Sequence, residues 1–184
     1  MPTHAPLARP LLVLMSGAPG SGKTTLARLL SQKMGLYHLE RDSLKLGIEF
    51  TSHSSPANRS KTVVPIYFEL VANMLALRIS IIADGSHYAG KTEKDLQRFG
   101  AVATVVNIHC HAANHHERFL RRVAAEAHEQ PGWLPEHLPD ITAIYQQTRE
   151  PLAHGYETLE VDTTTEEYEP SLAVIVAWIM ARAR

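Results

Sequence analysis

Short apolar runs alternate with longer amphipathic stretches along the chain. The runs predict five β-strands, at residues 11–15, 36–39, 79–84, 102–109 and 158–161. Apolar runs of this length are typical of strands that are buried on both faces of a sheet. Between them, apolar residues recur at three- and four-residue spacing. This spacing predicts helices over residues 23–34, 42–50, 63–77, 92–99, about 114–128, about 135–149 and about 166–182.

The strand-then-helix order predicts the α/β class, with a parallel sheet covered by helices and joined by right-handed crossovers. Ligands of such sheets bind at the carboxyl ends of the strands. A length of 184 residues fits one domain over residues 1–184, with residues 1–10 as a flexible tail. The polar segment 51–62 lacks periodicity and is predicted to be a loop.

Composition narrows the classes of function. The 18 Lys and Arg residues nearly balance 19 Asp and Glu, so the net charge of -1 gives no overall attraction to nucleic acid. The longest apolar run outside the strands, residues 172–180, is far shorter than the roughly 20 residues of a membrane-spanning helix. The single cysteine, Cys110, forms no internal disulfide, and no export signal opens the chain. We therefore expect a cytoplasmic protein without a membrane segment.

The strongest motif lies between the first strand and the first helix. It fits G-x-x-x-x-G-K-[ST] and reads Gly17, Ala18, Pro19, Gly20, Ser21, Gly22, Lys23 and Thr24, followed by Thr25. Backbone N–H groups of such a loop, together with the N-terminus of the helix, hold a nucleotide phosphate. Lys23 would bridge the β- and γ-phosphates, and the Thr24 hydroxyl would ligate Mg²⁺. The alternative is a glycine-rich turn that carries the lysine and threonine by chance.

Two carboxylates are predicted at the same edge of the sheet. Asp84 ends the third strand, where a carboxylate orients Mg²⁺ in many phosphate-loop proteins; the alternative is a cap of the next turn. Asp42 follows the second strand and would face the γ-phosphate, where it would orient the proton of an acceptor hydroxyl. Its alternative role is to cap a helix that starts at Ser43.

Basic residues supply further candidates. Arg118 and Arg122 lie four residues apart on one predicted helix face, from which paired guanidinium groups would close over a transferring phosphoryl group. A solvated helix face is the alternative. The 51–62 segment carries His53, Arg59 and Lys61 and stands where small kinases bind the acceptor, although it would equally serve as a plain loop. A guanine-selecting N-K-x-D motif is absent from the sequence.

With these residues the chain resembles the small P-loop kinases that include the kinase domain of polynucleotide kinase, chloramphenicol phosphotransferase and the zeta-toxin-like enzymes. The matching features are residues 17–25, Arg41-Asp42 with a basic residue three further on, Asp84, and the E-R-x-x-x-R of Glu117, Arg118 and Arg122. The resemblance spans roughly residues 10–165. It implies a three-layer P-loop fold with sheet order 2-3-1-4-5, and a lid with connecting helices over residues 112–150.

The same resemblance implies ATP as phosphoryl donor, a catalytic role for Asp42 on the acceptor hydroxyl, and lid arginines on the phosphates. We assign Arg41, Lys45, Arg59 and His87 as candidate acceptor contacts. The sequence departs from its relatives at two places. Polynucleotide kinases have Arg where this chain has Lys45, and many relatives have a small residue or Thr followed by Asn where this chain has Gly85-Ser86-His87.

A histidine-rich segment, His109 to His116 around Cys110, raises the alternative of a metal site. Successive strand residues face opposite sides of a sheet, so His109 and His111 would share a face that Cys110 does not. We expect His109 and His111 to line the upper edge of the sheet or to cap the turn that follows.

Together these features predict a Mg²⁺- and ATP-dependent phosphotransferase that acts on a hydroxyl of a small-molecule or nucleotide-like acceptor. Two alternatives stay open. One is a polynucleotide 5′-hydroxyl kinase, and the other is a nucleotide-dependent regulatory or toxin-like ATP-binding module. The acceptor itself, a preference for ATP over GTP and the oligomeric state are not encoded in any motif of the sequence.

Overall fold

The computed structural model describes residues 7–51, 56–88, 90, 92–126, 141–152 and 155–183. Five strands form one sheet in the order β2-β3-β1-β4-β5, and all neighbours pair in parallel. The strands are β1 (Leu11–Ser16), β2 (Tyr37–Glu40), β3 (Ile81–Asp84), β4 (Thr104–His111) and β5 (Glu157–Asp162). The predicted fold class and strand order are confirmed.

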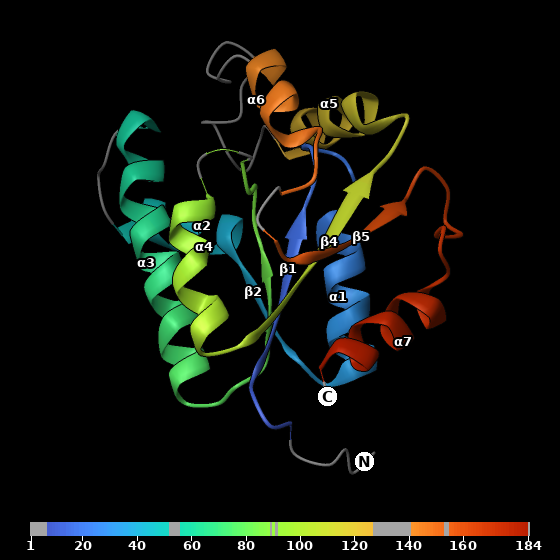
Figure 1. Ribbon diagram of the computed structural model, residues 1–184. Helices are drawn as coiled ribbons and strands as arrows, with labels where there is room; N and C mark the ends of the chain where they lie inside the picture. The colour runs from blue at the N-terminus through green and yellow to red at the C-terminus, as the bar shows by residue number, and fades with distance from the viewer. Residues whose placement is uncertain are drawn as a thin grey trace.

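Helices cover both faces of the sheet and the edge at which its strands end. They are α1 (Lys23–Met34), α2 (Arg41–Thr51), α3 (Pro56–Ala76), α4 (Glu93–Gln97), α5 (His115–Glu126), α6 (Ile141–Thr148) and α7 (Leu172–Arg182), with a short 3₁₀ helix at Arg98–Ala101. Figure 1 shows α1 and α7 on one face, α3 and α4 on the other, and α5 and α6 above the arrowheads of the strands. The carboxyl ends of the strands therefore meet at an edge that α5 and α6 cover.

The central strand β1 joins two layers of core. Every residue of β1 is buried, which fits its continuous apolar sequence. Val13 and Met15 pack toward the side of α1 and α7, whereas Leu12 and Leu14 pack toward the side of α3. Both faces of β1 thus anchor the strand, and the loop that leaves its end starts from a fixed position.

The helix after this loop ends as its sequence predicts. It spans Lys23–Met34, and Gly35 follows with a left-handed φ of 67°. The N–H of Gly35 donates to the carbonyl of Ser31 at 2.9 Å, which satisfies one of the orphan carbonyls of the last turn.

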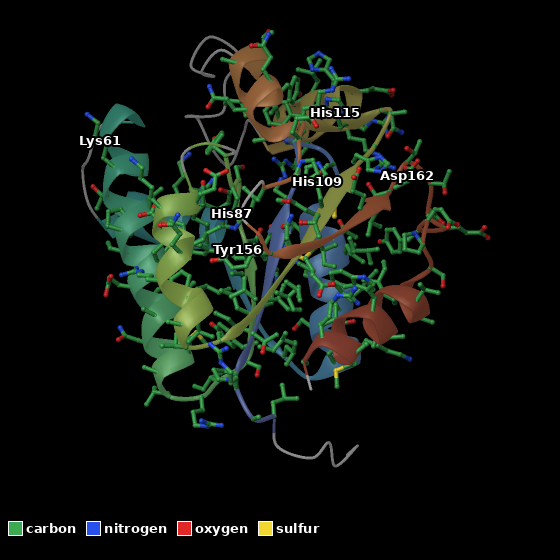
Figure 2. All side chains as sticks on the ribbon, in the orientation of Figure 1. Lys61, His87, His109, His115, Tyr156 and Asp162 are labelled. Atoms are coloured by element: carbon green, nitrogen blue, oxygen red, sulfur yellow. The ribbon has the colours of Figure 1, made fainter. Side chains whose placement is uncertain are left out.

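The predicted loop at 51–62 is wrong from residue 56 onward, because α3 begins at Pro56 and continues through the whole predicted helix 63–77 as far as Ala76. Proline suits a first helical position, where its missing N–H has no partner to lose. The first turns carry no apolar spacing because they extend beyond the core: Lys61 and Thr62 are exposed, and Figure 2 shows Lys61 at the far end of α3. Residues 52–55, which include His53, lie outside the described residues.

The last helix is shorter than predicted, since it begins at Leu172 and not at 166. Before it, Glu169 pairs with Asp162 through two backbone hydrogen bonds of 2.7 and 3.1 Å. Pro170 follows and has no N–H to donate to a helix. The pairing closes residues 163–168 into a loop directly after β5, at the same edge as the loop between β1 and α1.

Candidate functional site

The loop between β1 and α1 curls through three glycines with positive φ. Their φ angles are 133° at Gly17, 80° at Gly20 and 77° at Gly22, and the N–H of Ser21 donates to the carbonyl of Ala18 at 3.0 Å. Successive residues of this kind turn their N–H groups into one concavity. Gly22 immediately precedes α1, so the concavity continues into the N-terminus of that helix.

Neighbouring backbone presses directly against this loop. A Cβ atom on Gly17 would lie 2.2 Å from the carbonyl oxygen of Cys110, and one on Gly20 would lie 2.0 Å from that of His115. Both contacts are far inside van der Waals distance and involve backbone atoms that cannot swing away. The loop therefore fits between the end of β4 and the start of α5 only if both positions are glycine.

A hollow of about 320 Å³ lies over the loop. Its lining comes from the phosphate loop, from α5 and from the loop after β5: Gly20, Gly22, Lys23, Thr24, Thr25, Arg118, Arg122, Thr163, Thr165, Glu166 and Tyr168. The structure thus brings the predicted Lys23, Thr24, Thr25 and both predicted arginines together. The loop after β5 joins them.

Lys23 lies among charges of both signs. Its Nζ is 3.4 Å from the carbonyl oxygen of Ala18, to which it donates. Burial lowers the pKa of the Lys23 ammonium, and the nearby Arg122 adds to that effect, while the carboxylates of Asp84 and Asp42 oppose it. The lysine is therefore close to the predicted catalytic carboxylate Asp42, to the predicted metal ligand Asp84 and to Arg122.

Arg118 holds the loop after β5. Its Nη1 and Nη2 donate to the carbonyl oxygens of Thr163 and Thr164, each at 2.8 Å. The Thr163 hydroxyl donates to the carbonyl of Ser21 at 2.6 Å and lies 3.1 Å from that of His111. This network ties α5, the phosphate loop and the 163–168 loop together around the hollow.

Asp84 is buried, with 2% of its side chain exposed, and His38 of β2 lies beside it. The distance from Nε2 of His38 to Oδ2 of Asp84 is 3.4 Å. Burial alone would raise the pKa of Asp84, but hydrogen bonding from His38 and Thr24 and the charge of Lys23 hold it below its ordinary value. Asp84 is thus a carboxylate beside the Thr24 hydroxyl.

These two side chains fit a magnesium ion. Oδ1 of Asp84 is buried and has no hydrogen bond of normal geometry to any described residue. A hydroxyl and a carboxylate oxygen are hard ligands of the kind that Mg²⁺ prefers, and the ion needs few of them because it keeps several waters.

Asp42 lies in the first turn of α2, which begins at Arg41. The capping alternative required Asp42 to precede a helix that starts at Ser43. Because α2 already includes Asp42, that alternative is wrong. The Asp42 side chain is 46% exposed, and its Oδ1 lies 4.0 Å from Nη2 of Arg41. Nη1 of Arg41 donates to the carbonyl of Ser86 at 2.9 Å, which fixes the start of α2 against the end of β3.

The other predicted acceptor contacts lie at different depths. Lys45 is half-buried one turn after Arg41, and Arg59 belongs to the first turns of α3. His87 is 2% exposed and packs against Tyr67 and Phe68, with ring centroids 6.3 Å apart in both pairs. Figure 2 shows it between α3 and the sheet. Its position is one of the core, so an acceptor contact by His87 stays a prediction without support from the geometry.

Burial is the main cause of the shifted pKa of the His87 ring. Together with the charge of Arg41, it lowers the pKa of His87 to about 4. Its two ring nitrogens are buried without a hydrogen bond of normal geometry to a described residue. His87 is therefore neutral near pH 7.

Two residues near the carboxylates were missed by the sequence analysis. His38 looks like an ordinary strand residue, and only the register that pairs Glu40 with Asp84 brings it to that carboxylate. Tyr67 of α3 is fully buried, and burial and the charge of Asp84 raise its pKa. Helical periodicity marks Tyr67 as core, which it is, but carries no sign of the charges around it.

Strand alternation places the histidines as predicted. Cys110 belongs to the core on the α1 side, while His109 and His111 face the other way. His109 lies between the hydroxyl of Ser16, 2.9 Å from Nδ1, and the carbonyl of Arg149, 3.0 Å from Nε2. Within the described residues, no group of three or more His, Cys, Asp or Glu side chains could hold a metal ion.

Comparison with known proteins then places the chain. The family model of the zeta toxin matches residues 2–163. The chain belongs to the zeta toxin family. A search of curated proteins found no match.

Among the solved structures similar to this zeta toxin family member are proteins described as kinases. A candidate kinase from Chloroflexus aurantiacus superposes with a TM-score of 0.74 at 24% identity, covering 95% of this chain and 98% of its own. A sugar kinase from a Janibacter species gives 0.60 at 17%, covering 95% and 94%. The APS kinase CysC of Mycobacterium tuberculosis, solved with AMPPNP and APS, gives 0.60 at 16%, covering 94% and 96%. At these identities the likeness establishes the P-loop kinase fold.

None of the helices in the described ranges is both long enough and apolar enough to span a membrane.

The glycine contacts can be tested with a matched pair of substitutions. Gly20 and Gly35 both have positive φ, but a Cβ on Gly35 meets no atom within 4 Å. We expect Gly20→Ala to abolish nucleotide binding, because the loop must move off the backbone of His115. Gly35→Ala should lower the free energy of unfolding by about 1 kcal/mol and leave binding unchanged. Calorimetric titration with AMPPNP measures both, and equal binding by the two variants would contradict the packing argument.

The buried histidine predicts a loss of stability in acid. Since the pKa of His87 is about 4 in the folded chain and about 6.5 in the unfolded chain, only the unfolded chain gains this proton as the pH falls between those values. The ring should therefore contribute about 2 kcal/mol of the stability lost between about pH 7.5 and about pH 5. Measured by urea unfolding, the free energy of unfolding of His87→Phe should fall less over this pH range than that of the native chain. His111→Phe, at an exposed position, should not change the loss.

Proposed function

We propose that this protein transfers the γ-phosphoryl group of ATP to a hydroxyl group of a small-molecule or nucleotide-like acceptor. The observation that carries the proposal is the convergence of Lys23, Asp42 and Asp84 at the carboxyl ends of three adjacent strands. Both carboxylates are close enough to Lys23 to act on the pKa of its ammonium. The kinase fold of the similar structures supports the same class of reaction.

The nucleotide would bind in the hollow over the phosphate loop. Its phosphates would accept from backbone N–H groups of the phosphate loop and of the start of α1, and the ammonium of Lys23 would bridge the terminal phosphates. Its base would lie toward the 163–168 loop, which Arg118 fixes through two carbonyls. Ordered in this way, the hollow would position the phosphoryl donor before any acceptor arrives.

Thr24 and Asp84 would hold Mg²⁺, which when bound neutralises charge on the phosphates and orients them. His38 would position Asp84: by contacting Oδ2, it leaves Oδ1 directed to other ligands. Such outer contacts commonly set the affinity and geometry of a metal site.

Asp42 would act on the acceptor. Its side chain is partly exposed, unlike that of Asp84, so an incoming hydroxyl can reach it. A carboxylate at this point orients the hydroxyl and accepts its proton as the phosphoryl group transfers. The Arg41 bond to Ser86 fixes the start of α2, and with it the position of Asp42.

The two lid arginines, Arg118 and Arg122, would have different roles in the reaction. Arg122 lines the hollow and affects the pKa of Lys23, so its guanidinium would stabilise charge on the transferring group. Arg118 would act on the phosphates only if it exchanged its carbonyl partners. Lys45 and Arg59, from α2 and α3, would contact the acceptor.

Substitution of Asp42 separates a phosphotransferase from a binding module. We expect Asp42→Asn to lower acceptor-stimulated ATP turnover by about 10²-fold or more, because general-base contributions have that size, while AMPPNP affinity stays within about twofold. A coupled ADP-release assay with nucleosides, sugars, aminoglycosides, chloramphenicol-like diols and 5′-hydroxyl oligonucleotides measures turnover. Asp95→Asn, at an exposed position of α4, is the matched control. Stimulation by no acceptor, with equal background hydrolysis in both variants, would favour the regulatory module.

The proposed metal site can be tested without turnover. With AMPPNP bound, Mn²⁺ titration followed by electron paramagnetic resonance should show about 10-fold weaker metal affinity for His38→Phe, because Asp84 loses its positioning contact. His38→Gln keeps a side-chain donor and should recover most of the affinity. Equal Mn²⁺ affinity in both variants and the native chain would remove His38 from the site.

A further inference from the structure

A second cavity, of about 520 Å³, lies between α6 and the carboxyl ends of β4 and β5. It is distinct from the nucleotide hollow, and of the residues proposed above for phosphoryl transfer only Ala18 and Ser21 of the phosphate loop line it. Its lining includes Ala18, Ser21, His109, Tyr145 and Gln146. In Figure 2, the labelled His109 lies below α6, and His115 lies beside α6 at the start of α5.

The cavity shares a wall with the nucleotide hollow. Along the phosphate loop, Gly20 and Gly22 line the hollow, whereas Ala18 and Ser21 line the cavity. After β5 the residues alternate in the same way. Thr163 and Thr165 line the hollow, and Asp162 and Thr164 line the cavity. A single layer of backbone therefore separates the two spaces in both segments.

The deepest side chains of the cavity are uncharged. Nε2 of His109 must carry the proton, because the carbonyl of Arg149 can only accept, and Nδ1 then accepts from the Ser16 hydroxyl. Burial lowers the pKa of His109, so its ring stays neutral near pH 7. Ser21 adds a buried hydroxyl that has no hydrogen-bond partner among the described residues.

Polar groups lie toward the opening. His111 and Gln146 are exposed, and the Oδ1 of Asp162 accepts from the N–H of Thr164 at 2.7 Å. The ring of Tyr145 packs edge-on against His115, with centroids 4.8 Å apart, which gives the cavity an aromatic wall. A buried, uncharged interior of alanine, histidine and hydroxyl groups, with further polar groups at its mouth, in a volume of this size, fits a small-molecule site.

We propose that this cavity binds an uncharged aromatic or heteroaromatic small molecule, and that its binding tightens the binding of nucleotide. The ring would lie against His109 and Tyr145, and a polar substituent would reach Gln146 or His111. A ligand in the cavity would pack against the backbone of the phosphate loop and of the 163–168 loop and restrict its motion. These loops would then lose less conformational entropy when nucleotide binds. By linkage, nucleotide must tighten the aromatic ligand by the same factor.

Indole and quinoline are suitable probes. Titrated into ¹⁵N-labelled protein that is saturated with AMPPNP and Mg²⁺, at least one should bind with a Kd of about 1 mM, as expected for a ligand of this size. The amide signals of Ala112, Ala113 and Gln146 should shift. Without probe, the Kd of AMPPNP is measured by calorimetry; with probe it should fall by about fivefold.

A pair of tryptophan variants locates the site. Gln146→Trp places an indole at the mouth of the cavity and should abolish probe binding. Arg121→Trp places the same group on an exposed part of α5 and should not change it. Thermal melting confirms that both variants fold. Because the readout is binding, failure of the proposed phosphoryl transfer would not affect this test.

Three results would overturn the proposal. One is absence of binding by both probes up to about 5 mM, a concentration well above the expected Kd. Another is displacement of the probe by AMPPNP, which would place the ring in the nucleotide hollow. The third is equal binding by Gln146→Trp and Arg121→Trp. A change of less than twofold in the Kd of AMPPNP would overturn the coupling.

Discussion

The close approach of three backbone segments around the phosphate loop is the constraint on which the site depends. The carbonyl of Cys110 lies against Gly17, the carbonyl of His115 lies against Gly20, and the hydroxyl of Thr163 binds the carbonyl of Ser21. These contacts come from the ends of β4 and β5 and from the start of α5. Parallel pairing of β1 with β4, which sets Ser16 opposite His109, fixes their positions. The sheet therefore determines the shape of the loop through backbone contacts, and the side chains of Lys23 and Thr24 need only extend from the helix that follows.

Charge in the site is arranged around one lysine. Burial disfavours the Lys23 ammonium, and Arg122 adds repulsion, while Asp84 and Asp42 favour its charged form. A polyphosphate that entered the hollow would bring negative charge to both cations at once and would relieve their mutual repulsion. The charges of Lys23 and Arg122 thus favour binding of an anion, at a point where the carboxylates of Asp84 and Asp42 would otherwise repel it.

Periodicity was sufficient to predict the α/β class, because short strand-like runs alternate with stretches long enough to form helices, whereas the strand order was implied by the resemblance to small P-loop kinases. The phosphate loop was predictable for the same local reason, since its spacing and its place between strand and helix are both visible in the sequence. Local pattern failed where tertiary position decides. The polar start of α3 is helical from Pro56, although its residues show no apolar spacing that would predict a helix. His38 meets Asp84 only through the β2–β3 register, and the cavity under α6 depends on how that helix sits over the sheet.

The pair of lid arginines shows that two residues on one helix face can make different contacts. A separation of four residues places Arg118 and Arg122 on one helix face, and both do line the nucleotide hollow. Yet Arg118 donates to two carbonyls of the loop after β5, and a guanidinium so engaged organises the walls of the site. Arg122 is the one whose charge is felt at Lys23. Because the carbonyl contacts of Arg118 also fix Thr163, which in turn binds Ser21, this arginine links the lid helix to the phosphate loop through the 163–168 loop. We therefore expect Arg118 to act on a bound phosphate through the shape of the hollow, and Arg122 to act on it through its charge.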